Sequence, residues 1–292
     1  MNITVWGGSG FLGSHVCDVL TESGHGVMIA DINESPWIKD GQKMFIGDIT
    51  NLSDVIRSIK DSDIVYNFAG IADIEQANED PISTVEQNIK GNTNILEASV
   101  QEGIKRYIFA STVYVYSQSG GFYKCSKQAC ELFIEEYFNK FNLNYSILRF
   151  GTLYGPRSGE NNSIYNFIKQ ALQNEKIIYD GKPESIREYI HVKDAAKICL
   201  DILDSQYSNQ HFVLTGSQPI KVKNTISMIG EILKKDKLVS EFKADKTSYH
   251  YEFTPYSYNP RIGRKFTLPV HIDFGQGIIQ LAEQIKSELD NQ

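Results

Sequence analysis

The sequence has little of what builds metal centres, disulfide scaffolds or membrane spans. Its 292 residues include four cysteines, none in a Cys-x-x-Cys pair, and six histidines without the spacing of metal ligands. We therefore expect reduced thiols and no metal. No apolar run approaches the ~18 residues that a membrane span requires, and no basic segment precedes an apolar one near Met1. From these absences we expect a cytoplasmic protein that does not bind a membrane.

Positive charge is also scarce. The formal net charge is −7, whereas proteins that bind nucleic acid carry clustered positive charge. We therefore expect no nucleic-acid partner, and any anionic ligand must be met by a few local cations. A hydrophobic content of 41% is enough for a substantial core in one large or two smaller domains.

Glycine is concentrated between the first expected strand and the first expected helix. The run Ile3-Thr4-Val5-Trp6 is typical of a short buried strand, and a helical pattern follows the glycines to about Ser23. Gly7 permits a tight turn, Gly10 lets the backbone approach a pyrophosphate, and Gly13 lets the helix pack closely on the strand. The helix N-terminus then points at the anion. This spacing predicts dinucleotide binding.

The second expected strand, residues 26–31, ends in an acid about twenty residues beyond the glycines. There the Asp31 carboxylate can accept hydrogen bonds from both hydroxyls of an adenosine ribose. It would repel a 2′-phosphate, and no arginine stands beside it, so Asp31 favours NAD over NADP. The alternative is a solvated acid at a strand end.

Further strands are expected at residues 44–46, 64–68, 106–111 and 145–148, alternating with helical patterns. Helices with apolar faces are expected at about 85–100 and 124–137. This alternation predicts an α/β fold, a Rossmann-type, doubly wound parallel sheet covered by helices on both sides. Ligands bind such sheets at the carboxyl ends of the strands.

A tyrosine and a lysine stand four positions apart in Tyr123-Lys124-Cys125-Ser126-Lys127, with Ser111-Thr112 upstream. On a helix, Tyr123 and Lys127 lie one turn apart on one face. An ammonium beside a phenol favours the phenolate, which lowers a pKa that is ordinarily near ~10. The pattern therefore predicts that Tyr123 acts as a general base.

Several longer segments share a family pattern. They are the glycine loop, Gly47-Asp48-Ile49, Asn67-Phe68-Ala69-Gly70, Asn88-Ile89-Lys90-Gly91, Ser111-Thr112-Val113-Tyr114-Val115-Tyr116, the run from Leu148 to Arg157, and the run from Arg187 to Asp194. In these segments the chain resembles the extended short-chain dehydrogenase/reductase family, in particular its nucleotide-sugar epimerases and dehydratases.

The resemblance implies an NAD cofactor and a nucleotide-diphosphate sugar as substrate. It implies that Tyr123 takes a proton from a sugar hydroxyl, that Lys127 lowers the pKa of Tyr123 and holds the nicotinamide ribose, and that Thr112 hydrogen-bonds the same sugar oxygen. The cofactor-binding residues that it implies are Gly7, Gly10, Phe11, Leu12, Gly13, Asp31, Asp48, Ile49, Phe68, Ala69, Gly70, Asn88, Ser111, Tyr123 and Lys127.

The resemblance also divides the chain. Residues 1–150 form the NAD-binding domain, residues 151–292 a smaller C-terminal α/β substrate domain, and about 192–215 rejoins the first sheet. Arg187 is expected to bind the diphosphate, because its planar fork matches phosphate oxygens. Its alternative is a surface ion pair with Glu188 or Asp194, and Arg261, a second candidate for substrate charge, could be a solvated basic turn. We expect a homodimer, which family members form through a pair of helices.

The chain departs from the family between its catalytic strand and helix. Thr112 and Tyr123 are only eleven positions apart, so the segment 117–122 is shorter than the family's loop over the substrate, and we expect a more open pocket. The 4,6-dehydratases place an Asp-Glu pair after the threonine, where this chain has Val113-Tyr114. We expect neither side chain to move the required proton, which leaves epimerisation, most often at carbon 4.

Three alternatives remain from the sequence. A nucleotide-sugar reductase or dehydrogenase would use the same Thr112, Tyr123 and Lys127 but consume its cofactor. A 4,6-dehydratase is disfavoured by Val113-Tyr114. A non-catalytic, NAD-sensing binding protein would need the glycine loop but not the Tyr-Lys pair.

Overall fold

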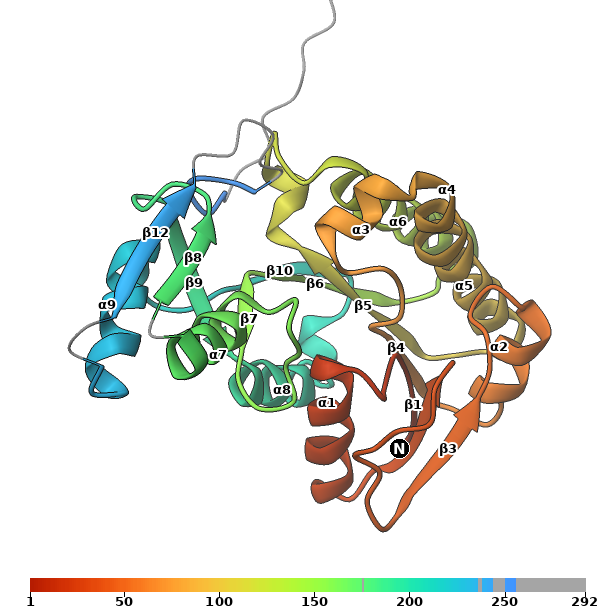
Figure 1. Cartoon of the computed structure of the whole chain (residues 1–292). Helices are drawn as coiled ribbons and strands as arrows, with labels where there is room; N and C mark the ends of the chain where they lie inside the picture. The colour runs from red at the N-terminus through yellow and green to blue at the C-terminus, as the bar shows by residue number, and fades with distance from the viewer. Residues whose placement is uncertain (175, 236–237, 244–249, 256–292) are drawn as a thin grey trace, which may run out of the picture. The chain divides into compact units, whose positions relative to one another are not determined.

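Seven parallel strands form the central sheet of this computed structural model, which describes residues 1–174, 176–235, 238–243 and 250–255 (Figure 1). The described residues lie in one unit of the chain, and a second unit, residues 260–292, falls outside them. The strand order is β10-β6-β5-β4-β1-β2-β3. The bounds are β1 Asn2–Trp6, β2 Gly26–Asp31, β3 Gln42–Ile46, β4 Ile64–Asn67, β5 Arg106–Thr112, β6 Tyr145–Phe150 and β10 Gln210–Leu214.

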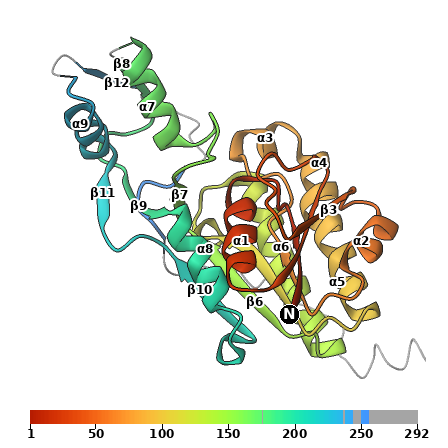
Figure 2. The same ribbon diagram turned by 90° about the horizontal axis from the view of Figure 1, so that it is seen from below.

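Helices cover both faces of this sheet, which confirms the predicted doubly wound fold (Figure 2). Helices α1 (Phe11–Glu22) and α8 (Val192–Asp201) share one core with the sheet. Helices α2 (Leu52–Ile59), α5 (Gly91–Gln101) and α6 (Gly121–Phe141) share the core on the other face.

The two cores follow from alternation along the strands. In β1, Ile3 and Val5 pack toward α1 and α8, whereas Trp6 packs on the opposite face. All three side chains are at least 99% buried. Successive side chains of a strand point to opposite faces, so a strand covered on both sides reads as a nearly continuous apolar run.

Strand order places the crevice of this sheet beside β1. The chain runs from β1 outward through β2 and β3, then returns to β4 on the other side of β1 and continues to β5 and β6. Where the direction of winding reverses, the connections leave in opposite directions and open a crevice at the strands' carboxyl ends. Gly7, residues 67–70 and residues 111–112 all lie at this edge.

The segment after β6 forms two small sheets with their own core. Phe167, Ile177 and Ile226 are buried in it. β10 returns to pair in parallel with β6, and the domain boundary at residue 150 stays a prediction. The bounds are β7 Thr152–Tyr154, α7 Ser163–Asn174, β8 Lys176–Asp180, β9 Ile186–His191, β11 Pro219–Lys221, α9 Val222–Ile232 and β12 Val239–Lys243.

Short helices complete the described chain. They are α3 Ile74–Glu79, α4 Pro81–Thr84, the π-helix η1 Val85–Lys90, and the 3₁₀ helices η2 Val113–Tyr116 and η3 Ser205–Tyr207. None of the helices in the described ranges is both long and apolar enough to cross a bilayer.

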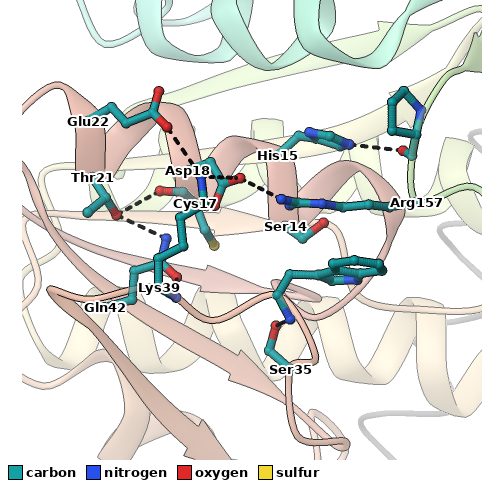
Figure 3. Close-up of polar contacts among 12 residues, drawn as sticks. Ser14, His15, Cys17, Asp18, Thr21, Glu22, Ser35, Lys39, Gln42 and Arg157 are labelled. Carbon is teal, nitrogen blue, oxygen red and sulfur yellow. Dashed lines mark hydrogen bonds and ion pairs between the residues drawn. The ribbon is translucent and has the colours of Figure 1, made fainter.

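A buried ion pair ties helix α1 to the turn that follows β7 (Figure 3). Arg157 Nη2 donates to Asp18 Oδ2 at 2.7 Å, and the two side chains are 15% and 10% exposed. Lys39, from the β2–β3 loop, reaches the same oxygen at 2.9 Å. The Arg157 guanidinium also lies 4.8 Å from the ring centre of Trp37 in that loop. Asp18 thus joins three segments that are far apart in sequence.

We predict that Arg157→Met lowers the free energy of unfolding by about 2 kcal/mol, because it leaves a buried carboxylate with one cation instead of two. The urea midpoint of unfolding measures this. Lys90→Met, which removes a half-exposed pair with Glu86, is the matched control and should change stability by less than about 0.5 kcal/mol. If both substitutions changed the free energy of unfolding equally, the Arg157–Asp18 pair would stabilise the fold no more than an exposed ion pair does.

Candidate active site

A cavity of about 750 Å³ opens at the carboxyl ends of β1, β2, β4 and β5. It brings together almost every residue that the sequence predicted for cofactor binding. The predicted residues that line it are Gly7, Gly10, Phe11, Leu12, Gly13, Asp31, Asp48, Ile49, Phe68, Ala69, Gly70, Ser111, Thr112, Tyr123 and Lys127.

The glycine loop is shaped by close backbone contacts. Gly7 has φ +77°, and a Cβ there would lie 2.6 Å from Ala69 N. A Cβ on Gly13 would lie 2.2 Å from the Gly7 carbonyl oxygen. Among the described residues no side chain caps α1, whose first turn lines the cavity. Its first N–H groups can therefore bind an anion, which fits a pyrophosphate.

Asp31 and Asp48 are both partly exposed at the cavity. Each Asp31 oxygen accepts one backbone N–H, from Ser9 at 3.1 Å and from Asn33 at 3.1 Å. A carboxylate has about four acceptor positions, so Asp31 keeps capacity for two ribose hydroxyls. Asp48 Oδ1 accepts hydrogen bonds from the backbone and the hydroxyl of Thr50, which fixes its own loop.

Asn88 is the one predicted cofactor-binding residue that does not line this cavity, and its role in cofactor binding stays a prediction. Its amide holds the loop after β4 instead: Oδ1 accepts from Ile71 N at 2.7 Å, and Nδ2 donates to Ile71 O at 3.0 Å. Nδ2 also lies 2.9 Å from Ser126 Oγ on α6. These three hydrogen bonds hold the loop that forms the cavity wall. They use most of the hydrogen-bonding capacity of the Asn88 amide, so few donor or acceptor positions remain for a ligand.

The structure brings Thr112, Tyr123 and Lys127 together at the end of β5. All three are at least 91% buried, and a hydrogen bond joins the Tyr123 hydroxyl to Thr112. Lys127 Nζ donates to the carbonyl oxygen of Ala110 at 2.9 Å and lies 5.9 Å from the Tyr123 ring centre. The predicted base, its cation and its hydroxyl partner therefore line one cavity.

The electrostatics of this group differ from the prediction. The sequence predicted that Lys127 depresses the pKa of Tyr123. In the structure, burial raises the pKa of Tyr123 to about 12, and only the hydrogen bond to Thr112 opposes that rise. Burial also lowers the pKa of Lys127, opposed by Cys130 and Glu131. This environment favours the neutral phenol of Tyr123.

Helix α6 begins at Gly121, three residues earlier than the sequence predicted, and this explains the short connection after Thr112. Gly120 and Gly121 have φ of +102° and +50°, which side-chain-bearing residues rarely adopt. Asn78, on α3, accepts a hydrogen bond from Phe122 N at 2.9 Å, and a Cβ on Gly121 would collide with its side chain. The tight glycine turn places Tyr123 in the first turn of α6.

A buried ion pair lies next to the predicted catalytic residues, and the sequence analysis did not predict it. Glu131 accepts hydrogen bonds from Ser111 Oγ and from Arg149 on β6, whose Nε is 3.0 Å from Glu131 Oε1. The Glu131 and Arg149 side chains are 9% and 13% exposed. The available signal was spacing, since Glu131 follows Tyr123 and Lys127 by one further helical turn.

A second cavity of about 300 Å³ borders the first and shares Thr112 and Tyr123 with it. Arg187, on β9, lines this cavity and is 8% exposed. Its guanidinium lies 4.5 Å from the ring centre of Tyr251, and within the described ranges it has no ion pair with Glu188 or Asp194. Arg261 lies outside the described residues, and the openness of the pocket stays a prediction.

Tyr114, His250 and Tyr251 also line the second cavity. The Tyr114 ring contacts those of Tyr123 and Tyr251 at centroid distances of 6.3 and 4.6 Å. Its hydroxyl lies 2.8 Å from His250 Nδ1. No local pattern could reveal these contacts, because 136 positions separate Tyr114 from His250.

Comparison with known proteins identifies the family pattern over most of the chain. The model of the NAD dependent epimerase/dehydratase family matches residues 3–215. This span contains the glycine loop, Asp31, the Thr112-Tyr123-Lys127 group and Arg187.

Individual relatives are similar over most of their length. A UDP-glucose 4-epimerase of Schizosaccharomyces pombe is 28% identical over an alignment that covers 77% of this chain and 79% of that protein. A UDP-N-acetyl-alpha-D-glucosaminuronate decarboxylase of Bacillus cytotoxicus is 28% identical over 74% of this chain and 75% of its own. The crystal structure of a Thermotoga maritima UDP-glucose 4-epimerase with UDP-glucose has a TM-score of 0.81 and 26% identity, covering 88% of this chain and 90% of that one.

The raised pKa of Tyr123 predicts how stability depends on pH. A tyrosine with a pKa near ~10 when unfolded and about 12 when folded stabilises the fold below pH ~10, and this stability is lost as the pH rises toward 12. Relative to Tyr123→Phe, the wild type should therefore lose about 1.4 kcal/mol of unfolding free energy between pH 8 and 11. Urea midpoints across this range measure it. A constant difference would mean that the Tyr123 phenol ionises as freely in the fold as in the unfolded chain.

Proposed function

The chain belongs to the NAD-dependent epimerase/dehydratase family, and from this premise we propose that it epimerises carbon 4 of a nucleotide-diphosphate sugar. The observation that carries the proposal is the meeting of two cavities at Thr112 and Tyr123. One cavity fits the cofactor, and the other leads from the same hydroxyl groups to Arg187. A sugar between them would have its reacting hydroxyl beside the base and its phosphates near a cation.

The residues of the larger cavity fit NAD. The uncapped start of α1 supplies N–H groups for the pyrophosphate, and Asp31 supplies acceptors for the adenosine ribose. Gly7 and Gly13 keep this surface bare, since a Cβ on either would collide with neighbouring backbone. We propose that Lys127 holds the nicotinamide ribose and that Ser111, whose hydroxyl is bound by Glu131, shapes the wall beside it.

In the proposed reaction Tyr123 is the group that moves the proton. NAD, when bound, accepts a hydride from the sugar and returns it, and its oxidised ring adds positive charge that favours the Tyr123 phenolate. Tyr123 then takes the hydroxyl proton while Thr112 hydrogen-bonds the same sugar oxygen. Lys127 adds a fixed positive charge nearby because Ala110 O holds its ammonium. For epimerisation the keto sugar turns over, and Tyr123 returns the proton.

Arg187 is proposed to bind the diphosphate. It is buried, lies at the second cavity and is stacked on Tyr251, which leaves its fork without a carboxylate partner among the described residues. A desolvated guanidinium binds phosphate oxygens strongly and in a defined orientation. Arg261, outside the described residues, remains a candidate for further contact with the substrate.

We also propose a homodimer. Large apolar side chains are exposed on neighbouring segments of α4, η1 and α6, and α4 and η1 both pack against α6. Ile82 is 76% exposed, Val85 49%, Leu132 63% and Phe133 43%. An apolar surface of this kind on two packed helices suits the helix-pair dimer expected from the family resemblance.

The direct test of the activity is stereochemical. Purified protein is incubated with NAD and, separately, with UDP-glucose, UDP-N-acetylglucosamine, UDP-glucuronate, dTDP-glucose, GDP-mannose and a CDP-sugar, and ring coupling is followed by proton NMR. Inversion at carbon 4 without accumulation of NADH supports the proposal. Stoichiometric NADH formation would instead identify a dehydrogenase, and loss of CO₂ from UDP-glucuronate a decarboxylase.

Tyr123→Phe should slow this inversion by about 10²- to 10⁴-fold, because it removes the proton acceptor and keeps the ring. Tyr165→Phe, at a half-exposed position on α7, is the matched control and should retain the wild-type rate. If Tyr123→Phe turned over normally, Tyr123 would not be the base.

Arg187→Met should raise the KM for the sugar nucleotide by about 10- to 100-fold and leave kcat nearly unchanged, because the diphosphate is bound equally in the ground and transition states. The control is Lys223→Met, an exposed cation of the same region that pairs with Glu184. Steady-state kinetics separates the two constants. A fall in kcat with unchanged KM would contradict a role in binding the diphosphate.

A further inference from the structure

Tyr114 occupies a position from which it can reach the same sugar as Tyr123. It lies in η2, two residues after Thr112, and lines the second cavity with Thr112, Tyr123 and Arg187. The rings of Tyr114 and Tyr123 meet edge to face at a centroid distance of 6.3 Å. Two phenols therefore border the space where the proposed reaction takes place.

His250 gives Tyr114 a proton acceptor. Its Nδ1 lies 2.8 Å from the Tyr114 hydroxyl, and the phenol donates this hydrogen bond in the neutral tautomer that leaves Nδ1 without a proton. His250 is an exposed residue, but partial desolvation of its imidazole lowers its pKa, and Arg187 lowers it further against the opposing effect of Asp73. The imidazole is thus neutral near pH 7. Burial raises the pKa of Tyr114, which keeps the phenol protonated until the imidazole takes its proton.

We propose that Tyr114 and His250 form a second acid–base pair, which exchanges the proton on a ring carbon next to the oxidised carbon 4. The inference rests on the proposed function, because only a keto sugar has such an acidic C–H bond. It goes beyond that function, since hydride transfer at carbon 4 breaks no bond to hydrogen at the neighbouring carbons.

The step balances without an oxidant or a reductant. The C–H bond next to the ketone breaks, its electron pair forms a carbon–carbon double bond, and the carbonyl oxygen becomes an enolate. The proton passes to the Tyr114 oxygen as the Tyr114 proton passes to His250 Nδ1. Thr112 and Tyr123, which hold the sugar oxygen, are placed to stabilise the enolate charge. The reverse step returns a proton to carbon.

The pair also revises an expectation from the sequence. Val113-Tyr114 was interpreted as unable to move a proton, which is correct for Val113 and for an isolated neutral tyrosine. A phenol hydrogen-bonded to a neutral imidazole is different, because the imidazole can act as base through the hydroxyl. One such pair can remove a proton from carbon. It offers no separate acid for a leaving hydroxyl, so the inferred activity is exchange, not loss of water.

The experiment follows deuterium and stereochemistry in the same sample. Full-length protein with NAD is incubated in D₂O with each sugar nucleotide of the panel, and proton NMR and mass spectrometry record the label. We expect inversion at carbon 4 together with deuterium at carbon 3 or carbon 5. Tyr114→Phe and His250→Gln should each slow incorporation by about 100-fold and keep inversion within about 10-fold of wild type.

Controls distinguish loss of the acid–base pair from unfolding of the variants and from the absence of any epimerase activity. Tyr165→Phe should keep both the label and the inversion, and the urea midpoints of Tyr114→Phe and His250→Gln show whether each variant is folded. Inversion without deuterium in the wild type would overturn the inference and leave the epimerase intact. Undiminished labelling in both variants would overturn it as well. Neither label nor inversion with any sugar would reject both proposals.

Discussion

Helix α6 is bonded to the end of one strand by three successive turns, and the candidate site depends on this contact. Tyr123, Lys127 and Glu131 lie on one face of the helix, and each binds one of the residues 110–112 of β5. The contact places a phenol, a cation and a hydroxyl at the crevice with little freedom to move. Arg149, on β6, pairs with Glu131. The hydrogen bond between Glu131 and Ser111 therefore leaves no unpaired charge inside the protein.

The contact between α6 and β5 also has an electrostatic consequence for Tyr123, because it buries the phenol. Burial fixes the geometry and also raises the pKa of Tyr123, so the phenol stays protonated near pH 7. Such a group gains reactivity only when positive charge arrives next to it. Rigid placement and a raised pKa are therefore two results of one environment, and in the proposed reaction proton removal by Tyr123 depends on the positive charge of bound NAD.

The residues at the carboxyl ends of the strands could be predicted from the sequence, because their position follows from the geometry of a parallel sheet. Parallel strands end at one edge, so Gly7, Asp31 and Thr112 had to come together once the strands were identified. The role of Asn88 in cofactor binding stays a prediction, because the motif marks a contact without saying whether a loop or a ligand receives it, and here the loop residue Ile71 does. The start of α6 at Gly121 was not predicted, because two successive glycines usually indicate a turn. Here Asn78, from a distant segment, accepts a hydrogen bond from Phe122 N in the first turn of the helix.

Other parts of the site could not come from the sequence at all. His250 meets Tyr114 through the tertiary fold, and Arg149 meets Glu131 across two elements. The sequence separation of neither pair matches a known motif or helical period, so sequence analysis could not identify them. The return of β10 to the large sheet was expected from the family resemblance and not from any spacing in the sequence.

The glycine turn before α6 has a consequence for how this enzyme could be changed. The connection from η2 to Gly120 follows Tyr114, which lines the second cavity, and Asn78 holds the start of α6 independently. Lengthening a flexible connection costs only about 0.6 kcal/mol for each doubling. Residues 117–119 are thus a natural insertion point, where new segments could alter the range of accepted sugars while the reacting groups stay in place.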